Sequence, residues 1–456
     1  MKKIFLLLFS MFFISVIFSQ HKNLKKHKPI FKKISPVKIS GPILPGAYQT
    51  DLYLPLLKDK RVAVFANHTA TLGNSHLVDS LIKLGINIVV AFGPEHGFRG
   101  TADAGEKVDN YTDSATGINV ISLYGKKTKP TADDLKDVDV MLFDIQDVGT
   151  RFYTYISSLQ DYLEAAIVNN KPLIVLDRPN PNGFYVDGPV LDTTFKSHIG
   201  MQPIPTVYGM TMGEYALYLI GERLKYSSSL PTAFEALFTE DLAIRRSKQK
   251  YFSSFFSVTG AKKIEPHFDL IVVPCKNYSH NSKYILPVKP SPNLPDMASV
   301  YWYASHCLFE GTVLSEGRGT DHPFAIFGHP SLPNNLFSFT PTSREGAKEP
   351  KLKDQLCYGW NLSGTDEEVL KQINNRIQLK YLLEAYKLFP DKEHFFIAPK
   401  NGNAKNYSFN RLAGNSELMA QIKSGKTEAE IRASWQPKLK EFKAIRKLYL
   451  LYPDFE

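Results

Sequence analysis

Short apolar segments alternate with helix-forming segments along the first half of the chain, and this alternation restricts the possible folds more than any other feature. Most of the predicted strands are largely apolar runs, which is typical of a parallel sheet that helices cover on both faces. The predicted strands span residues 61–66, 87–92, 118–123, 138–145, 172–176 and 268–273, and the predicted helices span 76–84, 131–138, 151–168 and 211–224. We therefore expect an α/β domain.

The second half of the chain has a different pattern. Residues 285–345 are rich in Pro, Gly, Ser and aromatic residues, which suits loops and short strands. From Thr365 the pattern becomes helical, with one capping box formed by Thr365 and Glu368 and another by Thr427 and Glu430. We predict that residues 46–273 form the α/β domain and that residues 274–456 form a smaller α+β domain.

The N-terminal residues carry the features of an export signal. Lys2 and Lys3 precede an apolar run over residues 4–18, and the small residue Ser19 follows. The run is shorter than the roughly 20 residues that a membrane-spanning helix needs, so residues 1–19 are predicted to be a cleaved signal peptide rather than an anchor. The protein is then expected to be periplasmic or secreted, with no transmembrane segment after cleavage.

The positive charge of the chain is concentrated in one short stretch. The net charge is +10, but after Lys38 there are 46 basic and 45 acidic residues. Residues 20–45 are therefore predicted to be a basic, disordered arm, and the body is close to neutral. A nucleic-acid-binding protein more often carries its positive charge on the folded surface, so we expect no nucleic-acid partner.

Sequence motifs for cofactors and metals are missing. No Gly-x-Gly-x-x-Gly fingerprint, P-loop or Gly-x-Ser-x-Gly elbow occurs, so no cofactor is expected and a serine esterase is disfavoured. His68 and His96 could bind a metal with nearby acids, but no His-x-x-x-His pair occurs, and no metal site is predicted. Cys275, Cys307 and Cys357 lack metal-ligand spacing; we expect three buried thiols, and one disulfide with a free thiol is the alternative.

Polar side chains follow the predicted strands, at the point where each strand ends. Ligands of an open parallel sheet bind outside the carboxyl ends of its strands. The residues that follow the strands in this way are Asn67, His68, Glu95, His96, Arg99, Tyr124, Asp147, Asp177, Arg178 and Asn180. Their convergence on one edge predicts a binding or catalytic site there.

Two glycine-rich segments hold charged residues that could act on a ligand. In residues 93–100, Glu95 lies beside an imidazole and a guanidinium, which suits proton transfer; equally, it could cap a turn or pair with Arg99. In residues 315–320, Arg318 lies between two glycines, which suits a carboxylate or phosphate ligand; a structural turn with a surface Arg is the alternative.

The longer motifs of the chain, in order, are residues 66–69, 92–100, 102–106, 144–155, 176–181, 290–295, 308–312 and 315–320. In these motifs the chain resembles the NamZ-type exo-β-N-acetylmuramidases. The resemblance implies a Rossmann-like N-terminal catalytic domain, a smaller C-terminal domain, and an active cleft between the two. It implies release of β-linked N-acetylmuramic acid from the non-reducing end of peptidoglycan fragments, with Glu95 of the Gly-Pro-Glu-His-Gly motif as the catalytic acid.

Glycoside cleavage usually needs a second catalytic group, and a muramic acid substrate needs a cation for its lactyl carboxylate. Candidates for the second group are Asp103, Glu106, Asp147, Glu316 and the acetamido group of the substrate itself. The candidate cations are Arg318, Arg99 and Arg151. Asn67, His68, His96, Tyr124, Asp177, Arg178 and Asn180 are further predicted substrate-binding residues. The alternative functions are a non-catalytic binding protein for wall glycans and a metal-dependent deacetylase or esterase.

Overall fold

A central sheet of eight strands forms the framework of the N-terminal half. The computed structural model describes residues 41–100, 109–223, 256–257, 269–400 and 403–456. The strands lie in the order β5 (Tyr111–Thr112), β6 (Asn119–Ser122), β4 (Asn87–Gly93), β1 (Arg61–Ala66), β7 (Val140–Asp144), β8 (Leu173–Leu176), β10 (Leu270–Val273) and β9 (Phe256–Ser257). The six inner strands pair in parallel, and the two edge strands pair antiparallel to their neighbours. The predicted α/β class is confirmed.

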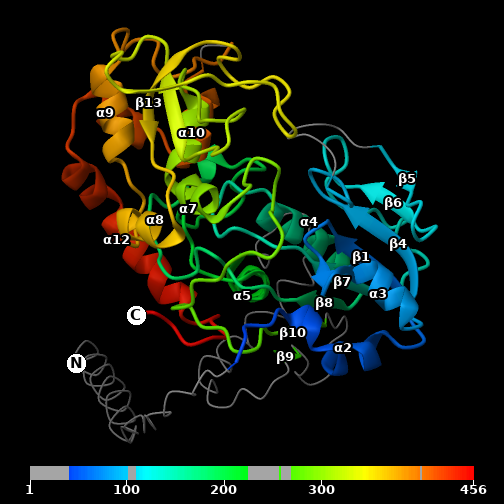
Figure 1. The fold of residues 1–456 in the computed structure, drawn as a ribbon. Helices are drawn as coiled ribbons and strands as arrows, with labels where there is room; N and C mark the ends of the chain where they lie inside the picture. The colour runs from blue at the N-terminus through cyan, green and yellow to red at the C-terminus, as the bar shows by residue number, and fades with distance from the viewer. Residues whose placement is uncertain (1–40, 101–108, 224–255, 258–268, 401–402) are drawn as a thin grey trace, which may run out of the picture. The chain divides into compact units, whose positions relative to one another are not determined.

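Both faces of this sheet are covered, as the apolar strands predicted. Along β1, Val62 and Val64 belong to one buried cluster, whereas Ala63 and Phe65 belong to another. The first cluster contains side chains of α2 (Thr50–Leu57) and α3 (Leu77–Lys83). The second contains side chains of α4 (Tyr155–Val168) and α5 (Met212–Tyr218), which lie on the other side of the sheet (Figure 1).

The second buried cluster continues into the C-terminal half. Helix α4 is buried over almost its whole length, and Figure 1 shows α4 and α5 between the strands and the C-terminal elements. Trp302 and Trp435, from two C-terminal helices, belong to the same cluster as Phe65 of the sheet. The cluster on this face therefore spans both halves of the chain, and residues 41–456 form one compact unit. The boundary at residues 273 and 274 stays a prediction.

The C-terminal half combines a small antiparallel sheet with helices, as expected for an α+β domain. Its sheet has the order β11 (Ile326–His329), β13 (Cys357–Asn361) and β12 (Phe337–Phe339). Its helices are α7 (Met297–His306), α8 (Asp366–Ile373), α9 (Lys380–Leu388), α10 (Ser408–Ala413), α11 (Glu417–Lys423) and α12 (Glu428–Arg446). Both predicted capping boxes are formed, at the first turns of α8 and α12.

Two helix predictions need correction. Residues 131–138 form turns rather than a helix, although Thr131 and Asp134 make the contacts of a capping box. The chain enters β7 at Val140, which leaves too few residues for a stable helix. The helix predicted from residue 151 begins only at Tyr155. Thr150 still forms a bridge with Val207, and the N–H of Arg151 donates to the carbonyl of Thr206 at 2.8 Å, so the chain still pairs with residues 206–207 there and turns into the helix afterwards.

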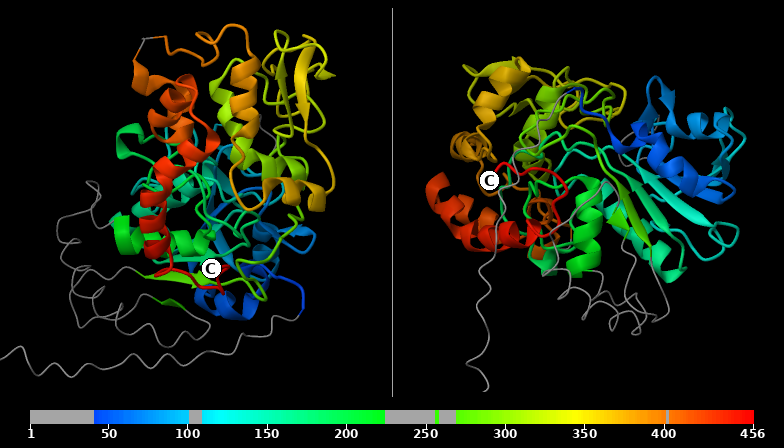
Figure 2. Two further views of the ribbon diagram at one scale, coloured as in Figure 1. Left: turned by 90° about the vertical axis from the view of Figure 1, so that its left-hand side faces the viewer. Right: turned by 90° about the horizontal axis from the view of Figure 1, so that it is seen from below.

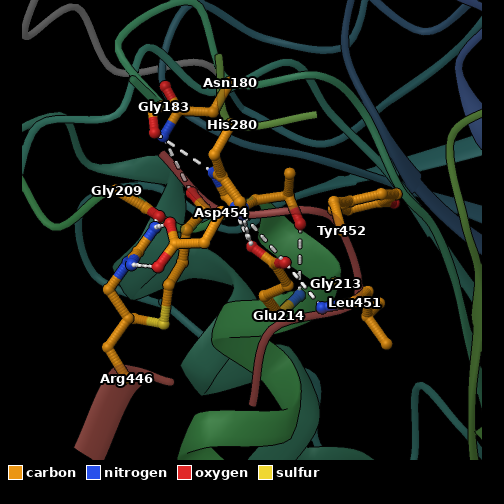
Figure 3. A network of polar contacts seen from close by, with 12 residues as sticks. Asn180, Gly183, Gly209, Gly213, Glu214, His280, Arg446, Leu451, Tyr452 and Asp454 are labelled. Carbon is orange, nitrogen blue, oxygen red and sulfur yellow. Dashed lines mark hydrogen bonds and ion pairs between the residues drawn. The ribbon is translucent and has the colours of Figure 1, made fainter. Parts of the chain in front are cut away.

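The C-terminal segment returns to the N-terminal sheet (Figure 2) and is fixed there by buried polar contacts (Figure 3). The fully buried ring of His280 contacts the carboxylate of Glu214 at 3.0 Å. The same carboxylate accepts a bond of 2.7 Å from the backbone N–H of Leu451. Burial alone would raise the pKa of Glu214, but His280 and the surrounding N–H groups outweigh burial and hold this pKa below its usual value.

Two further contacts join the C-terminal segment to the same region. The hydroxyl of Tyr452 donates to the carboxyl of Asp177 at 2.5 Å. Arg446, also fully buried, forms a two-pronged pair with Asp454 at 2.9 Å and donates to the carbonyl of Gly209 (Figure 3). The last residues of the chain therefore belong to the core that supports the sheet.

The three cysteines are free and buried, so the expectation of three thiols is confirmed. In the described part of the chain, no helix is long and apolar enough to cross a membrane. The predicted signal peptide and most of the lysine arm fall before residue 41 and lie outside the described residues.

Candidate active site

The loop after β4 places Glu95 at the carboxyl edge of the sheet. A turn closes this loop, in which the N–H of Gly97 donates to the carbonyl of Pro94 at 2.9 Å. His96 and Gly97 both have positive φ, at 69° and 77°, so the backbone reverses directly after Glu95. Glu95 itself is half-buried.

Each carboxylate oxygen of Glu95 accepts a hydrogen bond from a hydroxyl. Oε1 accepts from Tyr124, which follows β6, at 3.0 Å. Oε2 accepts from Thr154, which directly precedes α4, also at 3.0 Å. The ends of β4 and β6 and the start of α4 thus meet at this carboxyl group, and the two hydroxyls orient it. Burial and the charge of Glu95 raise the pKa of Tyr124, so that hydroxyl remains a donor at neutral pH.

Thr154 was not among the predicted site residues. It is the N-cap of α4, where a threonine hydroxyl usually accepts a bond from the first turn of the helix. Here the hydroxyl makes no capping bond and turns to Glu95 instead. Its position within the 144–155 motif was the available signal, but a threonine before a helix is ordinarily interpreted as a cap.

Asn67, directly after β1, contacts the start of α4 beneath the site. Its amide donates to the hydroxyl of Tyr155 at 2.8 Å, and its carbonyl oxygen accepts from Thr69. Asn67 and Tyr155 are both fully buried. Asn67 therefore positions the first residue of α4 next to Thr154, and the structure gives it no exposed surface for direct ligand contact.

Three side chains of this edge hold a segment from the second half of the sequence. The ring of His68 contacts the carbonyl of Lys289 at 2.9 Å, and the hydroxyl of Tyr153 donates to the carbonyl of Pro290 at 2.8 Å. The ring of His96 lies 3.4 Å from the hydroxyl of Ser291. Residues 289–291 therefore pack beside the Glu95 loop, and the two histidines that sequence patterns placed there are part of this contact.

Asp147 is buried close to Tyr208 and Tyr153. Its Oδ2 accepts from the N–H of Gly149 at 2.6 Å and from the hydroxyl of Tyr208. Its Oδ1 has no hydrogen-bond partner among the described residues. Burial raises the pKa of Asp147 to about 7, and the charges of Asp147 and Glu95 both act on Tyr153. Asp147 is thus a carboxyl that can hold a proton near neutral pH.

The four predicted arginines have different surroundings. Arg99 pairs with Asp79 and Asp113, at 2.9 and 2.7 Å. The buried guanidinium of Arg151 donates to the carbonyls of Pro189, Ile204 and Leu412. Within the described residues it forms no ion pair with a carboxylate, and burial lowers its pKa to about 9. Arg151 is thus enclosed by groups of the protein itself, whereas Arg99 keeps 26% of its side chain exposed beside its two carboxylates.

Arg178, Asp177 and Asn180 also bind within the fold. Arg178 forms a fully buried pair with Asp144, with contacts of 2.5 and 2.8 Å. Asp177 accepts from Tyr452, Thr211 and Gly213, and burial raises its pKa to about 7. The amide of Asn180 donates to the carbonyl of Met210. These three predicted binding residues follow β8, but their contacts tie loops and the C-terminal segment to the sheet.

Arg318 lies in the C-terminal half, at the tight backbone that its two flanking glycines allow. Gly317 and Gly319 both have φ of 82°, and a side chain on either would meet a backbone oxygen within 2.4 Å. Arg318 contacts the carboxylates of Glu310 at 2.7 Å and Glu316 at 3.2 Å. The turn is therefore present, and the role of Arg318 as the cation for a ligand stays a prediction.

Two predicted candidates for the second catalytic group, Asp103 and Glu106, lie outside the described residues. Within the described ranges, no group of three His, Cys, Asp or Glu side chains is placed to hold a metal ion.

Comparison with known proteins matches the chain to one family. The N-terminal family description, exo-beta-N-acetylmuramidase NamZ, matches residues 62–298, and the C-terminal one matches residues 301–452. The chain is 35% identical over 426 residues to the peptidoglycan beta-N-acetylmuramidase NamZ of Bacillus subtilis (strain 168), and the match covers 88% of this chain and 89% of that protein.

Two crystal structures of DUF1343 family proteins from Bacteroides fragilis are also similar. One has a TM-score of 0.74 at 41% identity and covers 91% of this chain and 100% of its own. The other has a TM-score of 0.67 at 26% identity and covers 90% of this chain and 99% of its own. Since both family descriptions match in sequence order and together span most of the chain, this protein belongs to the NamZ exo-β-N-acetylmuramidase family.

Proposed function

We propose that this protein is an exo-acting glycoside hydrolase that releases N-acetylmuramic acid from the non-reducing end of peptidoglycan fragments, with Glu95 as the general acid. The activity of the Bacillus subtilis relative, a peptidoglycan beta-N-acetylmuramidase, supports the reaction and the substrate class. The observation that carries the role of Glu95 is its carboxyl group, held at the sheet edge by the hydroxyls of Tyr124 after β6 and Thr154 before α4.

A general acid must give its proton to the glycosidic oxygen as the bond breaks, and so its orientation matters as much as its charge. Tyr124 and Thr154 each hold one oxygen of Glu95. The residue is half-buried, so it is not enclosed within the core. Residues 289–290 pack beside the loop through His68 and Tyr153.

The second catalytic group has several candidates. Glu316 already contacts Arg318 and Lys351, so its charge is taken up within the protein. Asp147 is the described candidate that shares its neighbour Tyr153 with Glu95. Asp103, Glu106 and the acetamido group of the substrate complete the set.

The direct test of the reaction uses a disaccharide with β-linked N-acetylmuramic acid at the non-reducing end. The full-length protein should release free N-acetylmuramic acid from it, as identified by mass spectrometry. Long glycan strands should yield the same single sugar, and release of internal oligosaccharides would contradict the exo mode. Binding of the disaccharide without cleavage would favour a non-catalytic glycan-binding protein, and loss of cleavage with a chelator would favour a metal-dependent hydrolase.

Arg318 is proposed to bind the lactyl carboxylate of the muramic acid. Losing a charge-assisted contact of this kind costs on the order of 2–3 kcal/mol in binding of the transition state. Replacement of Arg318 by Ala should therefore lower kcat/KM on the muramic acid disaccharide by about two orders of magnitude. Chitobiose lacks the lactyl group, so any activity on it should fall far less. Equal losses on both substrates would assign Arg318 a structural role.

Export of the protein to the periplasm or beyond is part of the proposal. It rests on the signal-peptide features of residues 1–19, and an exported location suits a wall substrate. N-terminal sequencing of the mature protein tests it.

A further inference from the structure

The two carboxylates that contact Arg318 are held very differently. Glu316 is buried, with an exposed fraction of 3%, and its second oxygen lies 2.8 Å from the ammonium group of Lys351. Lys351 is itself anchored by the carbonyls of Phe309 and Thr312. Glu310 has 31% of its side chain exposed and contacts Arg318 through Oε1. Glu316 is therefore a fixed counterion, whereas Glu310 is at the surface and can leave.

Arg318 lies at one end of a row of aromatic rings that ends beside the Glu95 loop. Its guanidinium lies 5.2 Å from the ring centre of Phe324, which packs edge-to-face on Tyr303 at 4.7 Å. Tyr303 packs in turn on Tyr153 at 5.9 Å. Tyr153 directly precedes Thr154, whose hydroxyl holds Glu95. Packed aromatic rings therefore connect Arg318 with Tyr153, the residue that precedes Thr154.

We propose that Glu310 is a displaceable counterion, which occupies Arg318 in the free protein and which the lactyl carboxylate of muramic acid replaces on binding. This inference rests on the proposed function. It assigns to Glu310 a role in the selectivity of the binding site for an anionic sugar.

The exchange follows from charge balance. Arg318 and Lys351 face Glu316 and Glu310, so the cluster is neutral in the free protein. An incoming carboxylate that replaces Glu310 preserves this balance and keeps Arg318 paired, while Glu310 moves into water, where an ion is well solvated. A neutral sugar offers no replacement, so it leaves the pair of Arg318 and Glu310 intact. The pair therefore weakens binding of the anionic ligand and prevents a free cation from attracting other anions.

The test measures binding of two monosaccharides, N-acetylmuramic acid and N-acetylglucosamine, to the full-length protein by calorimetry. Replacement of Glu310 by Gln should tighten binding of N-acetylmuramic acid by about two- to fivefold, because the internal competitor is weakened. Binding of N-acetylglucosamine should not change. The matched control is Glu349→Gln, which removes an exposed carboxylate paired with Lys353 and should change neither affinity.

A second variant covers the case in which Glu310→Gln folds poorly. Glu310→Asp keeps the charge but shortens the side chain, which stretches the contact with Arg318 and should give a smaller gain for N-acetylmuramic acid. Unchanged or weaker binding in both well-folded variants, or an equal gain for both sugars, would overturn the proposal. Since binding is measured without turnover, a wild-type protein that binds N-acetylmuramic acid selectively yet cleaves no disaccharide would refute the proposed function and leave the counterion exchange standing.

Discussion

Replacing Glu95 by Gln is expected to lower turnover of the muramic acid disaccharide by about 10² to 10⁴. The amide has the shape of the carboxyl group but cannot supply its proton. One of the two hydroxyls that contact Glu95 can still donate to the amide oxygen, and the other can turn to accept from the amide nitrogen. The glycine-rich turn after Glu95 does not depend on the charge. We therefore expect the variant to fold, with an unchanged melting temperature, and to fail in the chemical step.

The leaving group distinguishes an acid from a residue that merely binds. A p-nitrophenyl β-glycoside of N-acetylmuramic acid needs little protonation of its leaving oxygen, so Glu95→Gln should lose much less activity on it than on the disaccharide. Tyr124→Phe is the graded control, because it removes one of the two hydroxyls and keeps the carboxyl group. Near-normal turnover of the disaccharide by Glu95→Gln would rule out Glu95 as the acid.

The position of the candidate site could be predicted from the sequence because it follows from strand order. Parallel strands end at one edge, so Glu95 and Tyr124 were expected on the same edge, and the pairing of β4 with β6 brings them into contact at 3.0 Å. The same reasoning placed His68 and His96 on that edge, where both contact residues 289–291. For these residues the edge of the sheet is set by the direction of the strands that precede them, which the sequence pattern predicted.

The direction of a side chain at the end of a strand could not be predicted in the same way. Arg178 follows β8, yet its guanidinium turns back to Asp144 at the end of the neighbouring β7. Arg151 turns into the core and finds three carbonyls, one of them from Leu412, far along the sequence. Such choices depend on tertiary partners that carry no local signal, which is why a basic residue in a motif looked like a ligand-binding group.

Long-range polar contacts of the C-terminal segment were also invisible in the sequence. Glu214 has a local role as the third residue of the capping box of α5, where it accepts from the N–H of Thr211. Its partners His280 and Leu451 come from distant parts of the chain. A pattern within one helix cannot reveal that the same carboxylate also closes the fold.

Removal of the His280 imidazole is expected to destabilise the protein strongly. Its Nδ1 lies 3.1 Å from the carbonyl of Gly183 and its Nε2 lies 3.0 Å from Glu214, both fully inside the core. Breaking a buried ion pair by removing one partner typically costs about 3–5 kcal/mol, because the other charge stays buried without its counterion. His280→Ala should therefore lower the urea midpoint of unfolding markedly.

The chain offers a matched control for this prediction. His394 also pairs with an acid, Asp391, at 2.7 Å, but 78% of its side chain is exposed. An exposed pair contributes only about 0–1 kcal/mol, so His394→Ala should leave the urea midpoint nearly unchanged. If burial determines how much each pair stabilises the protein, the free energies of unfolding of the two variants will differ by several kcal/mol, although each variant lacks one imidazole. Similar small shifts in both would mean that Glu214 finds compensation from Leu451 and Thr211, and that the C-terminal segment is held mainly by Tyr452 and Arg446.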